Sequence, residues 1–319
     1  MAVLELKNLG IDNSEELKKL NTVLNDIKAL KIQGATAVAQ EAVDAYAHYA
    51  EAISRKIDDR DKLIEHLFEM RLKVEDVRAT EPGMRNGLRY VYNKGMAEGF
   101  DRIGEFEDEF FNLMKESREK VAEYGSHRID DGDIVMTHCR SSFTEAIFVK
   151  AAEQGKKFTV IATETRPVFQ GRKTTERLSA HGIEIIHVVD SAMRWVMNHK
   201  NPRSVFIGAD SVTVEGVALN KIGSRLLGLS AKELHIPLYV CTSMLKYDSA
   251  TNLGRLSEIE MRTESEVWDN PPKGVKILNP AFETISRRYI SAYITEFGVI
   301  PPQGMWWTFK QNYPEFTER

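Results

Sequence analysis

Two side chains that can exchange protons stand at the ends of short apolar, β-branched runs. Cys139 follows the run Asp133–His138, and Asp210 follows the run Ser204–Ala209. In an open α/β sheet, ligands bind outside the carboxyl ends of the strands. A thiol and a carboxylate delivered there by two strands can converge on one small molecule, so the pattern predicts an acid/base site.

Cys139 is followed by Arg140, Ser141 and Ser142, where the next helix should begin. Helix N-termini and cations both stabilise negative charge, so we expect the thiolate of Cys139 to be favoured. That form suits a general base or a nucleophile. The alternative is a buried cysteine that acts as a small apolar side chain, and position alone leaves both open. Cys241 stands inside an apolar run and is assigned to the core.

Asp210 could cap the turn that follows its strand and have no other role. The downstream pair Asn220 and Lys221 favours a functional role, because it brings donors and a positive charge close to a glycine. Backbone N–H groups at a helix start there would add to a phosphate site. The glycine-rich signatures of dinucleotide-binding and P-loop proteins do not occur in the sequence, which argues against both classes.

Other polar segments could also bind an anion. They are Gln33-Gly34-Ala35 at the start of an alanine-rich helix, Arg78 with Thr80, and the loop from Glu164 to Arg172 with Arg166 and Gln170. Each has a structural alternative. For the first, spacing alone favours a plain helix start, and a salt bridge between Glu164 and Arg166 would equally explain the loop.

Histidine and cysteine usage argues against a metal site or a disulfide framework. His138 would suit a general base, although a histidine in a strand more often makes a local hydrogen bond. None of the eight histidines has a spacing such as H-x-x-x-H paired with acids, so we expect no metal and no other cofactor. The two cysteines lack C-x-x-C spacing, which fits a reducing cytoplasm.

Composition limits the classes of partner. The 319 residues, 42% apolar and 28% charged, suit a globular protein with two domains or one large domain. A formal charge of −4 gives no reason to expect a nucleic-acid partner. The apolar runs are far shorter than the about 20 residues that span a bilayer, and the first residues lack a secretory pattern. We therefore expect a cytoplasmic protein without a membrane partner.

The elements that must position these residues change in kind near residue 125. Helices are expected after Ser14, from Gly34 to about Ile57, and over about Asp59–Val77, Gly83–Gly99 and Glu105–Tyr124. Strands are expected at Ile134–Thr137, Phe158–Ala162, Ile183–Val189, Ser204–Ile207 and Leu238–Thr242, with later extended pieces at Val275–Leu278 and Tyr289–Thr295. Helical stretches separate the strands. The pattern predicts an α/β protein, with a helical domain (1–125) before a doubly wound parallel sheet (126–319).

Several of these segments occur together in one known superfamily. The sequence resembles it in Thr137–Ser142, Glu164–Gly171, Gly208–Ser211 and Asn220–Gly223. The superfamily contains the α, β and δ subunits of translation initiation factor 2B, methylthioribose-1-phosphate isomerase and ribose-1,5-bisphosphate isomerase, and the match is nearest to the last. The resemblance spans roughly residues 31–302.

The resemblance implies a helical domain joined to a Rossmann-like domain, and a homo-oligomer that is a dimer or a hexamer built as a trimer of dimers. It implies that Cys139 and Asp210 are the catalytic pair of an isomerase that converts ribose 1,5-bisphosphate to ribulose 1,5-bisphosphate. The residues that it places around the phosphorylated pentose are Gly34, Arg78, Ser141, Ser142, Gln170, Asn220, Lys221 and Lys246. The reaction requires no cofactor.

Two positions depart from the isomerase pattern. The isomerases usually have Arg-Gly-Ala where this chain has Gln33-Gly34-Ala35. Loss of that guanidinium removes a bidentate phosphate donor, and a charged hydrogen bond contributes about 1.5–3 kcal/mol. Arg140 adds a cation beside Cys139 where one such isomerase has histidine, so either Arg140 binds the phosphate instead or the substrate differs. We count Gln33, Ala35 and Arg140 among the expected substrate-binding residues.

The expected mechanism uses the two groups in opposite protonation states. Asp210, protonated, would protonate the ring oxygen as the C1–O bond breaks, and the Cys139 thiolate would remove the C2 proton to give a phosphoenolate. One alternative is an isomerase of another pentose 1-phosphate, of the methylthioribose or deoxyribose type. The other is a non-catalytic regulatory subunit like those of initiation factor 2B.

Overall fold

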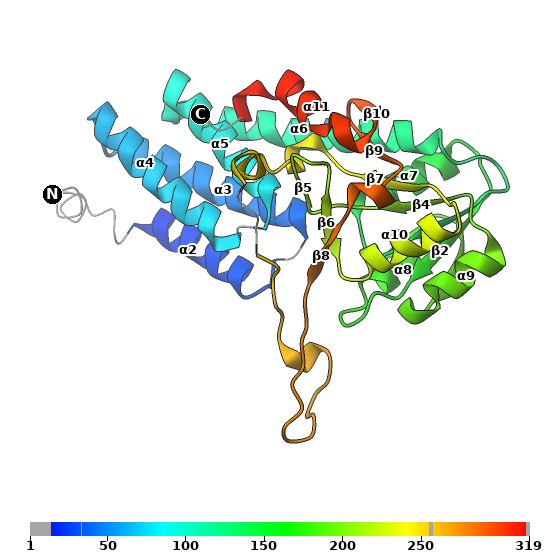
Figure 1. Ribbon diagram of the computed structural model, residues 1–319. Coiled ribbons are helices and arrows are strands. Elements are labelled where there is room, and N and C mark those ends of the chain that lie inside the picture. Colours follow the sequence, from blue (N-terminus) through cyan, green and yellow to red (C-terminus); the bar gives the residue numbers. More distant parts are fainter. Residues whose placement is uncertain (1–13, 33, 79, 255–257, 317–319) are drawn as a thin grey trace. The chain divides into compact units, whose positions relative to one another are not determined.

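The computed structural model describes residues 14–32, 34–78, 80–254 and 258–316 (Figure 1). The chain forms two compact units. One consists of the described residues up to Lys115 together with residues 315–316, and the other of the described residues from Glu116 to Pro314. Residue 125, where the sequence places the end of the helical domain, lies one residue before the end of helix α6 (Ile103–Ser126). None of the helices in the described ranges is both long and apolar enough to cross a membrane.

Local capping signals start the helices of the first unit where the sequence predicts them. These helices are α2 (Glu15–Lys28), α3 (Ala35–Ser54), α4 (Arg60–Glu75), α5 (Pro82–Glu98) and the first part of α6. The Ser14 hydroxyl accepts the Leu17 N–H at 3.2 Å, and Asp59 caps α4 in the same way. Pro82 occupies the first turn of α5, where a missing N–H costs nothing.

Small residues let the helices of this unit approach closely. A Cβ added at Gly87 of α5 would lie 2.5 Å from the Phe110 ring of α6 and 2.8 Å from Val43 of α3. Tyr46, which is fully buried on α3, donates its hydroxyl to the Leu67 carbonyl at 3.0 Å. The helical unit therefore has a packed core of its own, as the alanine-rich α3 predicts.

A seven-stranded sheet forms the second unit, in the order β10-β9-β7-β4-β1-β2-β3. The strands are β1 (Ile134–Thr137), β2 (Thr159–Thr163), β3 (Glu184–Val188), β4 (Ser204–Ile207), β7 (Leu238–Cys241), β9 (Ala292–Thr295) and β10 (Gly298–Ile300). Each neighbouring pair is parallel except β9 and β10, which are antiparallel. The prediction of a parallel sheet is confirmed.

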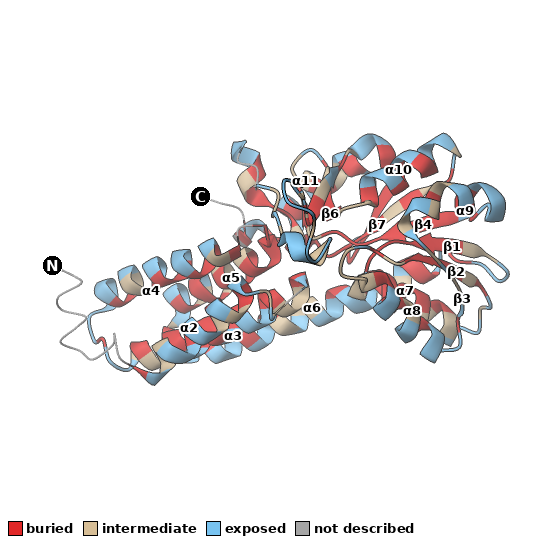
Figure 2. Cartoon of the chain, turned by 90° about the horizontal axis from the view of Figure 1, so that it is seen from below, coloured by how far each residue is buried: buried red, intermediate tan, exposed pale blue. Residues whose placement is uncertain are grey.

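The chain reverses its direction across the sheet between β1 and β4. It runs outward from β1 to β2 and β3, and then returns to β4 on the other side of β1. Helices α7 (Ser142–Glu153) and α8 (Gln170–Ala180) therefore cover one face, and α9 (Met193–Lys200) and α10 (Ser224–Glu233) cover the other (Figure 2). This is a doubly wound sheet, and its switch point lies between the carboxyl ends of β1 and β4.

The sheet core is apolar, as strands covered on both faces require. Its buried members include residues of β1, β2, β4 and the helix α7, namely Val135, Phe143, Ile147, Phe148, Val160 and Phe206. Cys241 belongs to the same cluster and is fully buried, so its assignment to the core is confirmed.

Two parts of the second unit differ from the sequence prediction. A three-stranded sheet of β5 (Ser211–Val212), β6 (Ala218–Lys221) and β8 (Phe282–Ile285) was not expected, because each strand is short and β8 is distant in sequence. The predicted extended piece Val275–Leu278 is not a strand. It lies in an arm, Glu258–Ala281, whose outer part has no neighbouring strand within the described residues (Figure 1).

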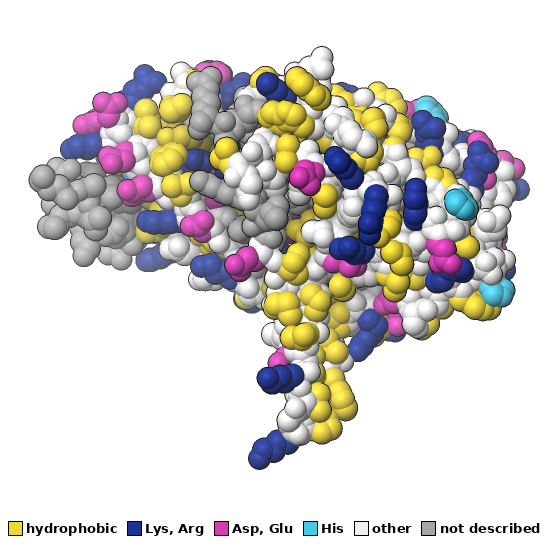
Figure 3. Space-filling view, viewed as in Figure 1, with side chains coloured by type: hydrophobic (Ala, Val, Ile, Leu, Met, Phe, Trp, Pro, Cys, Tyr) yellow, Lys and Arg dark blue, Asp and Glu magenta, His cyan; other side chains and the backbone are white. Residues whose placement is uncertain are grey.

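The two legs of this arm are joined near its base, where the Arg262 N–H donates to the Asn279 carbonyl at 2.8 Å. Apolar side chains are exposed along the arm (Figure 3). They are Met261, Trp268, Val275 and Leu278.

Candidate active site

The two proton-transfer candidates follow neighbouring strands. Thr137 of β1 pairs with Phe206 of β4, and Cys139 and Asp210 come two and three residues after the last residues of these strands. The charge of Asp210 acts on the pKa of Cys139, which places the two groups close together. The structure thus brings the thiol and the carboxylate to the switch point of the sheet, where ligands of doubly wound folds bind.

Two threonines hold the backbone of Cys139 in an unusual conformation. Its φ is 66°, in the left-handed region that costs a non-glycine residue about 1–2 kcal/mol. The Cys139 N–H donates to the Thr165 hydroxyl at 2.9 Å, and the Cys139 carbonyl accepts the Thr174 hydroxyl at 3.2 Å. Strain of this kind persists only where the surroundings enforce it, and it is concentrated at functional sites.

His138 makes the local hydrogen bonds that its place in the chain predicts. Its Nε2 lies 2.8 Å from the Ile222 carbonyl, which can only accept, so Nε2 carries the proton. Nδ1, 2.6 Å from the Thr163 hydroxyl, therefore accepts. Burial lowers the pKa of His138, so the ring stays neutral. Gly223 makes room for it, since a Cβ there would lie 2.8 Å from Nε2.

The thiol of Cys139 is protonated at neutral pH, contrary to the sequence expectation. Burial raises the pKa of this thiol to about 11, with the charges of Asp210 and Asp190 acting in the same direction. The Lys221 charge and the Arg140 backbone N–H lower the pKa of Cys139 but do not offset the burial. The side chain is only 8% exposed, a fact that the flanking helix start and arginine did not reveal.

Two lysines approach the ends of β1 and β4 without a carboxylate partner. Lys221 is 7% exposed, and its Nζ lies 4.7 Å from the centroid of the Phe282 ring. Lys246 donates from Nζ to the Ala209 carbonyl at 2.9 Å, directly before Asp210. Neither lysine takes part in a salt bridge of the described chain. A buried cation without a counterion is costly, so the pair is suited to an anionic ligand.

Asn220 is buried at the end of β6 and donates from Nδ2 to the Ser224 hydroxyl at 2.9 Å. The helix start that follows it is already occupied. The Glu283 carboxylate accepts the N–H groups of Gly223 at 2.6 Å and of Arg225 at 3.0 Å. The expectation that these amides add to a phosphate site is therefore wrong, because β8 delivers a carboxylate to them.

The start of α7 is capped differently. Ser141 is the N-cap residue, and its hydroxyl accepts the Thr144 N–H at 3.5 Å. Ser142, the first residue of the helix, is half-buried. A Cβ at Gly208 would lie 2.6 Å from the Ser141 hydroxyl, so the β4 end passes close to this helix start. Ser141 and Ser142 thus lie beside both Cys139 and the β4 end.

Arg140 is directed to an internal carboxylate. Its Nε lies 3.3 Å from Oε1 of Glu145, a residue of α7 that is almost completely buried. Arg177 pairs with the other oxygen of Glu145 at 3.3 Å, and Glu145 Oε1 lies 3.1 Å from the Thr174 hydroxyl, whose single proton it shares with the Cys139 carbonyl. The guanidinium of Arg140, which is half exposed, therefore neutralises a buried carboxylate that also joins α7 to α8 through Arg177.

The loop after β2 is fixed by Asp190 rather than by the expected Glu164–Arg166 bridge. The Asp190 carboxylate accepts the N–H groups of Thr165 at 2.8 Å and of Arg166 at 2.6 Å. Glu164 instead pairs with Arg172 at 2.9 Å. The Thr165 hydroxyl binds the Cys139 N–H, so Asp190, by holding Thr165, indirectly positions the backbone of Cys139.

Gln170 is the first residue of α8, and its side-chain oxygen is buried without a hydrogen-bond partner among the described residues. An unpaired buried amide oxygen costs about 1–3 kcal/mol, so a ligand hydroxyl there would be favourable. Gly171 allows α8 to start this close to β2, since a Cβ would lie 1.7 Å from the Thr163 carbonyl oxygen.

One supporting residue was not identified from the sequence. Glu296, only 4% exposed, accepts the Ser243 hydroxyl at 2.9 Å, the Met244 N–H at 3.0 Å and the Tyr313 hydroxyl at 3.1 Å. These bonds fix the short 3₁₀ turn Met244–Lys246, which carries Lys246. The only sequence signal is an acidic residue directly after a buried strand.

The remaining expected residues lie outside the sheet unit. Gly34 is the N-cap of α3 with φ of 88°, and Ala35 is buried behind it. Arg78 is buried in the helical unit, and its Nε lies 3.7 Å from Glu81 Oε1. Gln33 lies outside the described residues. The substrate-binding roles of these four residues remain predictions.

The fold and site define an α/β protein with a cysteine–aspartate pair and two lysines at the switch point of a doubly wound sheet. The chain belongs to the initiation factor 2 subunit family, whose model matches residues 31–302.

Relatives of known type include both enzymes and initiation factors. The chain is 37% identical over 300 residues to ribose 1,5-bisphosphate isomerase of Thermococcus kodakarensis, with 90% of this chain and 92% of that protein covered. It is 32% identical to methylthioribose-1-phosphate isomerase of Thermosipho melanesiensis, with 86% and 85% covered. Among solved structures, translation initiation factor eIF-2B of Pyrococcus horikoshii OT3 matches with a TM-score of 0.75 and 27% identity, covering 89% of this chain and 97% of that one.

Proposed function

We propose that this protein is an aldose–ketose isomerase that converts ribose 1,5-bisphosphate to ribulose 1,5-bisphosphate. The observation that carries the proposal is the meeting of Cys139 and Asp210 at the ends of adjacent strands β1 and β4. A ring-opening isomerisation needs one group that gives a proton and one that takes a proton. The similarity to ribose 1,5-bisphosphate isomerases over most of the chain supports the choice of substrate.

Charge favours a substrate that carries phosphate near these strand ends. Lys221 and Lys246 supply positive charge there, and Ser141 and Ser142 lie at the start of α7. A helix start and a buried ammonium both favour a phosphate group. We propose that the two lysines and the α7 start bind phosphate, with Asn220 and Gln170 donating to or accepting from the sugar.

The atoms of the reaction balance with two groups. A proton passes to the ring oxygen as its bond to C1 breaks, and the C2 proton is removed, leaving a double bond between C1 and C2. The 2-hydroxyl proton then returns to the group that gave the first proton, or to water. A proton delivered to C1 completes the ketose, and both side chains regain their starting states.

The raised pKa of Cys139 favours an assignment of roles opposite to the one expected from the sequence. A thiol that remains protonated at neutral pH can donate a proton to the ring oxygen, and the Asp210 carboxylate can take the C2 proton. The sequence expectation requires a thiolate and a protonated Asp210. In the substrate-free protein, the burial of Cys139 opposes that arrangement.

Turnover of ribose 1,5-bisphosphate by the purified chain, followed by phosphorus NMR, tests the proposal. We expect ribulose 1,5-bisphosphate from the wild type, and a loss of at least about 100-fold in rate for Cys139→Ser and for Asp210→Asn. Cys241→Ala is the matched control, since that thiol lies in the core, and it should retain activity. Either site variant with a near wild-type rate would contradict the assigned pair.

The methylthioribose-1-phosphate isomerase relative suggests a second substrate for the same pair. The two substrates differ in whether a second phosphate or an apolar thioether occupies the 5-position. A chain that turns over methylthioribose 1-phosphate and not ribose 1,5-bisphosphate would replace the proposed substrate and keep the mechanism. Well-folded protein without turnover of any pentose 1-phosphate would favour a regulatory subunit instead.

A further inference from the structure

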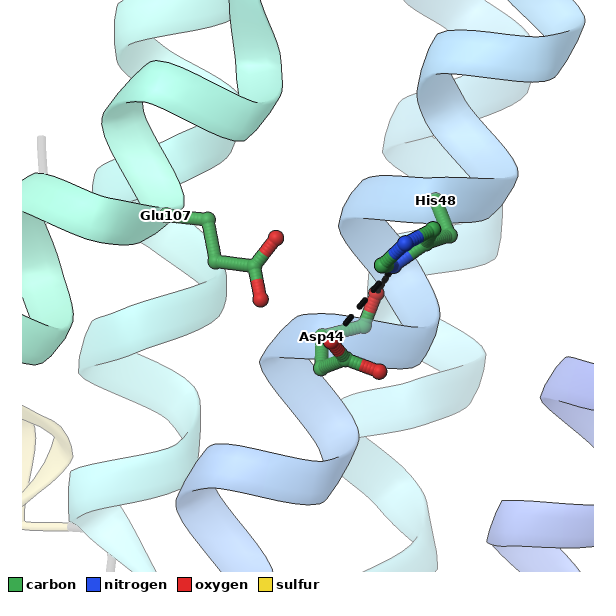
Figure 4. Close-up of side chains that lie close together, drawn as sticks. All are labelled: Asp44, His48 and Glu107. Carbon is green, nitrogen blue, oxygen red and sulfur yellow. Dashed lines mark hydrogen bonds and ion pairs between the residues drawn. The ribbon is translucent and has the colours of Figure 1, made fainter.

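Three potential metal ligands meet on two helices of the helical unit (Figure 4). Asp44 and His48 stand one turn apart on α3, and Glu107 comes from α6. Nδ1 of His48 lies 3.5 Å from Oδ1 of Asp44, and one ligand atom from each of the three residues lies within 4.8 Å of the others. In the part of the chain that the structure describes, this is the one such group of three.

Glu107 distinguishes this cluster from an ordinary exposed pair. The residue is only 8% exposed, and its side chain extends toward Asp44 and His48 (Figure 4). Its one interaction at hydrogen-bond range is with the Asp44 carboxylate, and no lysine or arginine of the described chain forms a salt bridge with it. A buried carboxylate facing another carboxylate lacks the counterion that it needs.

We propose that Asp44, His48 and Glu107 bind a divalent transition-metal ion of the Zn²⁺ type. One imidazole and two carboxylates form a ligand set that Zn²⁺ accepts, with water in the remaining position. Ligand distances of about 2.0–2.2 Å around a tetrahedral ion separate neighbouring ligand atoms by about 3.4 Å. The His48–Asp44 separation of 3.5 Å already fits that geometry. An oxygen of Glu107 lies within 4.8 Å of the other two ligand atoms, and the proposal requires rotation of this side chain to bring it closer.

Access and charge are consistent with a bound cation. The side chains of His48 and Asp44 are 69% and 52% exposed, so an ion can enter from solvent and retain water ligands. His48 Nδ1 lies 3.0 Å from the Asp44 carbonyl, and metal binding would replace the proton of that hydrogen bond. The ion would neutralise the carboxylate pair and tie α3 to α6.

The chain contains a comparison pair that lacks the buried third ligand. Glu123 and His127 also stand four residues apart on α6, with 3.1 Å between Nε2 and Oε1, and both are exposed. This pair does not belong to a group of three potential ligands among the described residues. It should not bind the ion with comparable affinity, because chelation by three groups is what fixes a metal.

The test uses the full chain, freed of metal with a chelator and titrated separately with Zn²⁺ and Co²⁺. Calorimetry should show one site for Zn²⁺, and Co²⁺ should produce visible absorption of a protein-bound ion. We expect His48→Ala and Glu107→Gln each to raise Kd by about tenfold or more, since even indirect support of a metal costs 10–100-fold when removed. His127→Ala, the matched control, should leave Kd unchanged.

Thermal unfolding gives a readout that does not depend on any catalytic activity. A ligand that binds only the folded state raises its stability, so at one Zn²⁺ concentration the Tm of wild type and of His127→Ala should rise equally, and that of Glu107→Gln should rise less. Absence of saturable Zn²⁺ binding in wild type would overturn the proposal. Equal Zn²⁺ binding by wild type and by both site variants would overturn it as well.

Discussion

The two strand-to-helix junctions around the proposed site, β1–α7 and β6–α10, carry different kinds of groups. Thr137–Ser142 brings a titratable thiol to a helix start that is capped by a neutral hydroxyl, at 3.5 Å. Asn220–Ser224 brings a fixed positive charge, Lys221, to a helix start that is capped by the Glu283 carboxylate, at 2.6 Å and 3.0 Å. Two N–H groups at the α10 start are thus already bound to a carboxylate of the fold, whereas the residue that caps the α7 start is uncharged.

His138 makes the two junctions mechanically dependent on each other. It follows β1 and donates to Ile222 in the second junction, and Gly223 leaves the space for its ring. Under the proposed function, the first junction would supply a proton-transfer group and the second a positive charge, and the His138 imidazole joins the two segments. Variants that act on one junction alone can test this division.

The largest effect should come from removing the charge of the second junction. Lys221→Met should raise KM for a sugar bisphosphate by about 10–100-fold, since a charge-assisted hydrogen bond contributes about 1.5–3 kcal/mol. Steady-state kinetics measures it. Lys232→Met, on the exposed side of α10, is the control and should leave KM unchanged. A Lys221→Met protein with wild-type KM would show that Lys221 does not face the substrate.

The next effect concerns the contact between the junctions. Gly223→Ala places a Cβ 2.8 Å from His138 Nε2 at a φ of 101°, so we expect a loss of about 1–3 kcal/mol in the free energy of unfolding together with reduced kcat. Denaturant unfolding and kinetics report the two quantities. Gly132→Ala has a similar φ of 85° with no atom near its Cβ, and it should lose stability by strain alone and keep kcat. Equal effects of both variants on kcat would show that the contact between Gly223 and His138 has no specific effect on turnover.

A smaller effect should separate the two helix starts. Ser141→Ala removes the α7 cap and should cost about 1 kcal/mol in stability and also raise KM. Glu283→Gln weakens the α10 cap by a similar amount, but it should leave KM nearly unchanged because those amides do not bind substrate. Paired unfolding and kinetic measurements are needed for both variants. A higher KM in Glu283→Gln than in Ser141→Ala would show that the α10 start, and not the α7 start, is the one that affects substrate binding.

The smallest effect is expected from alkaline pH. With Cys139 as the proton donor, kcat/KM should be nearly constant from pH 8 to pH 10, because its pKa is raised to about 11. A tenfold rise per pH unit over that range would instead assign the thiolate as the base. The free energy of unfolding should change with pH for the same reason. The pKa of Cys139 in the folded protein lies above the usual value of 9.0, so burial of the neutral thiol contributes fully to stability below pH 9. This contribution is lost as the pH rises toward 11.

The parts of the fold that depend on neighbouring residues could be predicted from sequence. Ser14, Asp59 and Pro82 start helices through contacts within a few residues, and β1 ends at Thr137 as its apolar run does. The small sheet could not be predicted, because β6 pairs with β8 across a long excursion of the chain. For the same reason, the capping of α10 by Glu283 could not be predicted from sequence.

The candidate site divides in the same way. The convergence of Cys139 and Asp210 follows from strand order, which alternation of strands and helices predicts. The pKa of Cys139 is raised by burial under distant segments, whereas the flanking residues alone predict that it is lowered. Arg140 looked available in sequence, yet its partner Glu145 becomes a neighbour only once α7 has formed.

The rigid bridge made by His138 also has a consequence for selectivity. The His138 ring is hydrogen-bonded to the Ile222 carbonyl, so it joins the backbone that carries the thiol to the backbone that carries Lys221. A sugar held through its phosphate by Lys221 would present a carbon to the thiol only if the two are separated by the matching number of bonds. Discrimination among phosphorylated sugars would then depend on the length of the substrate and would not require a moving lid.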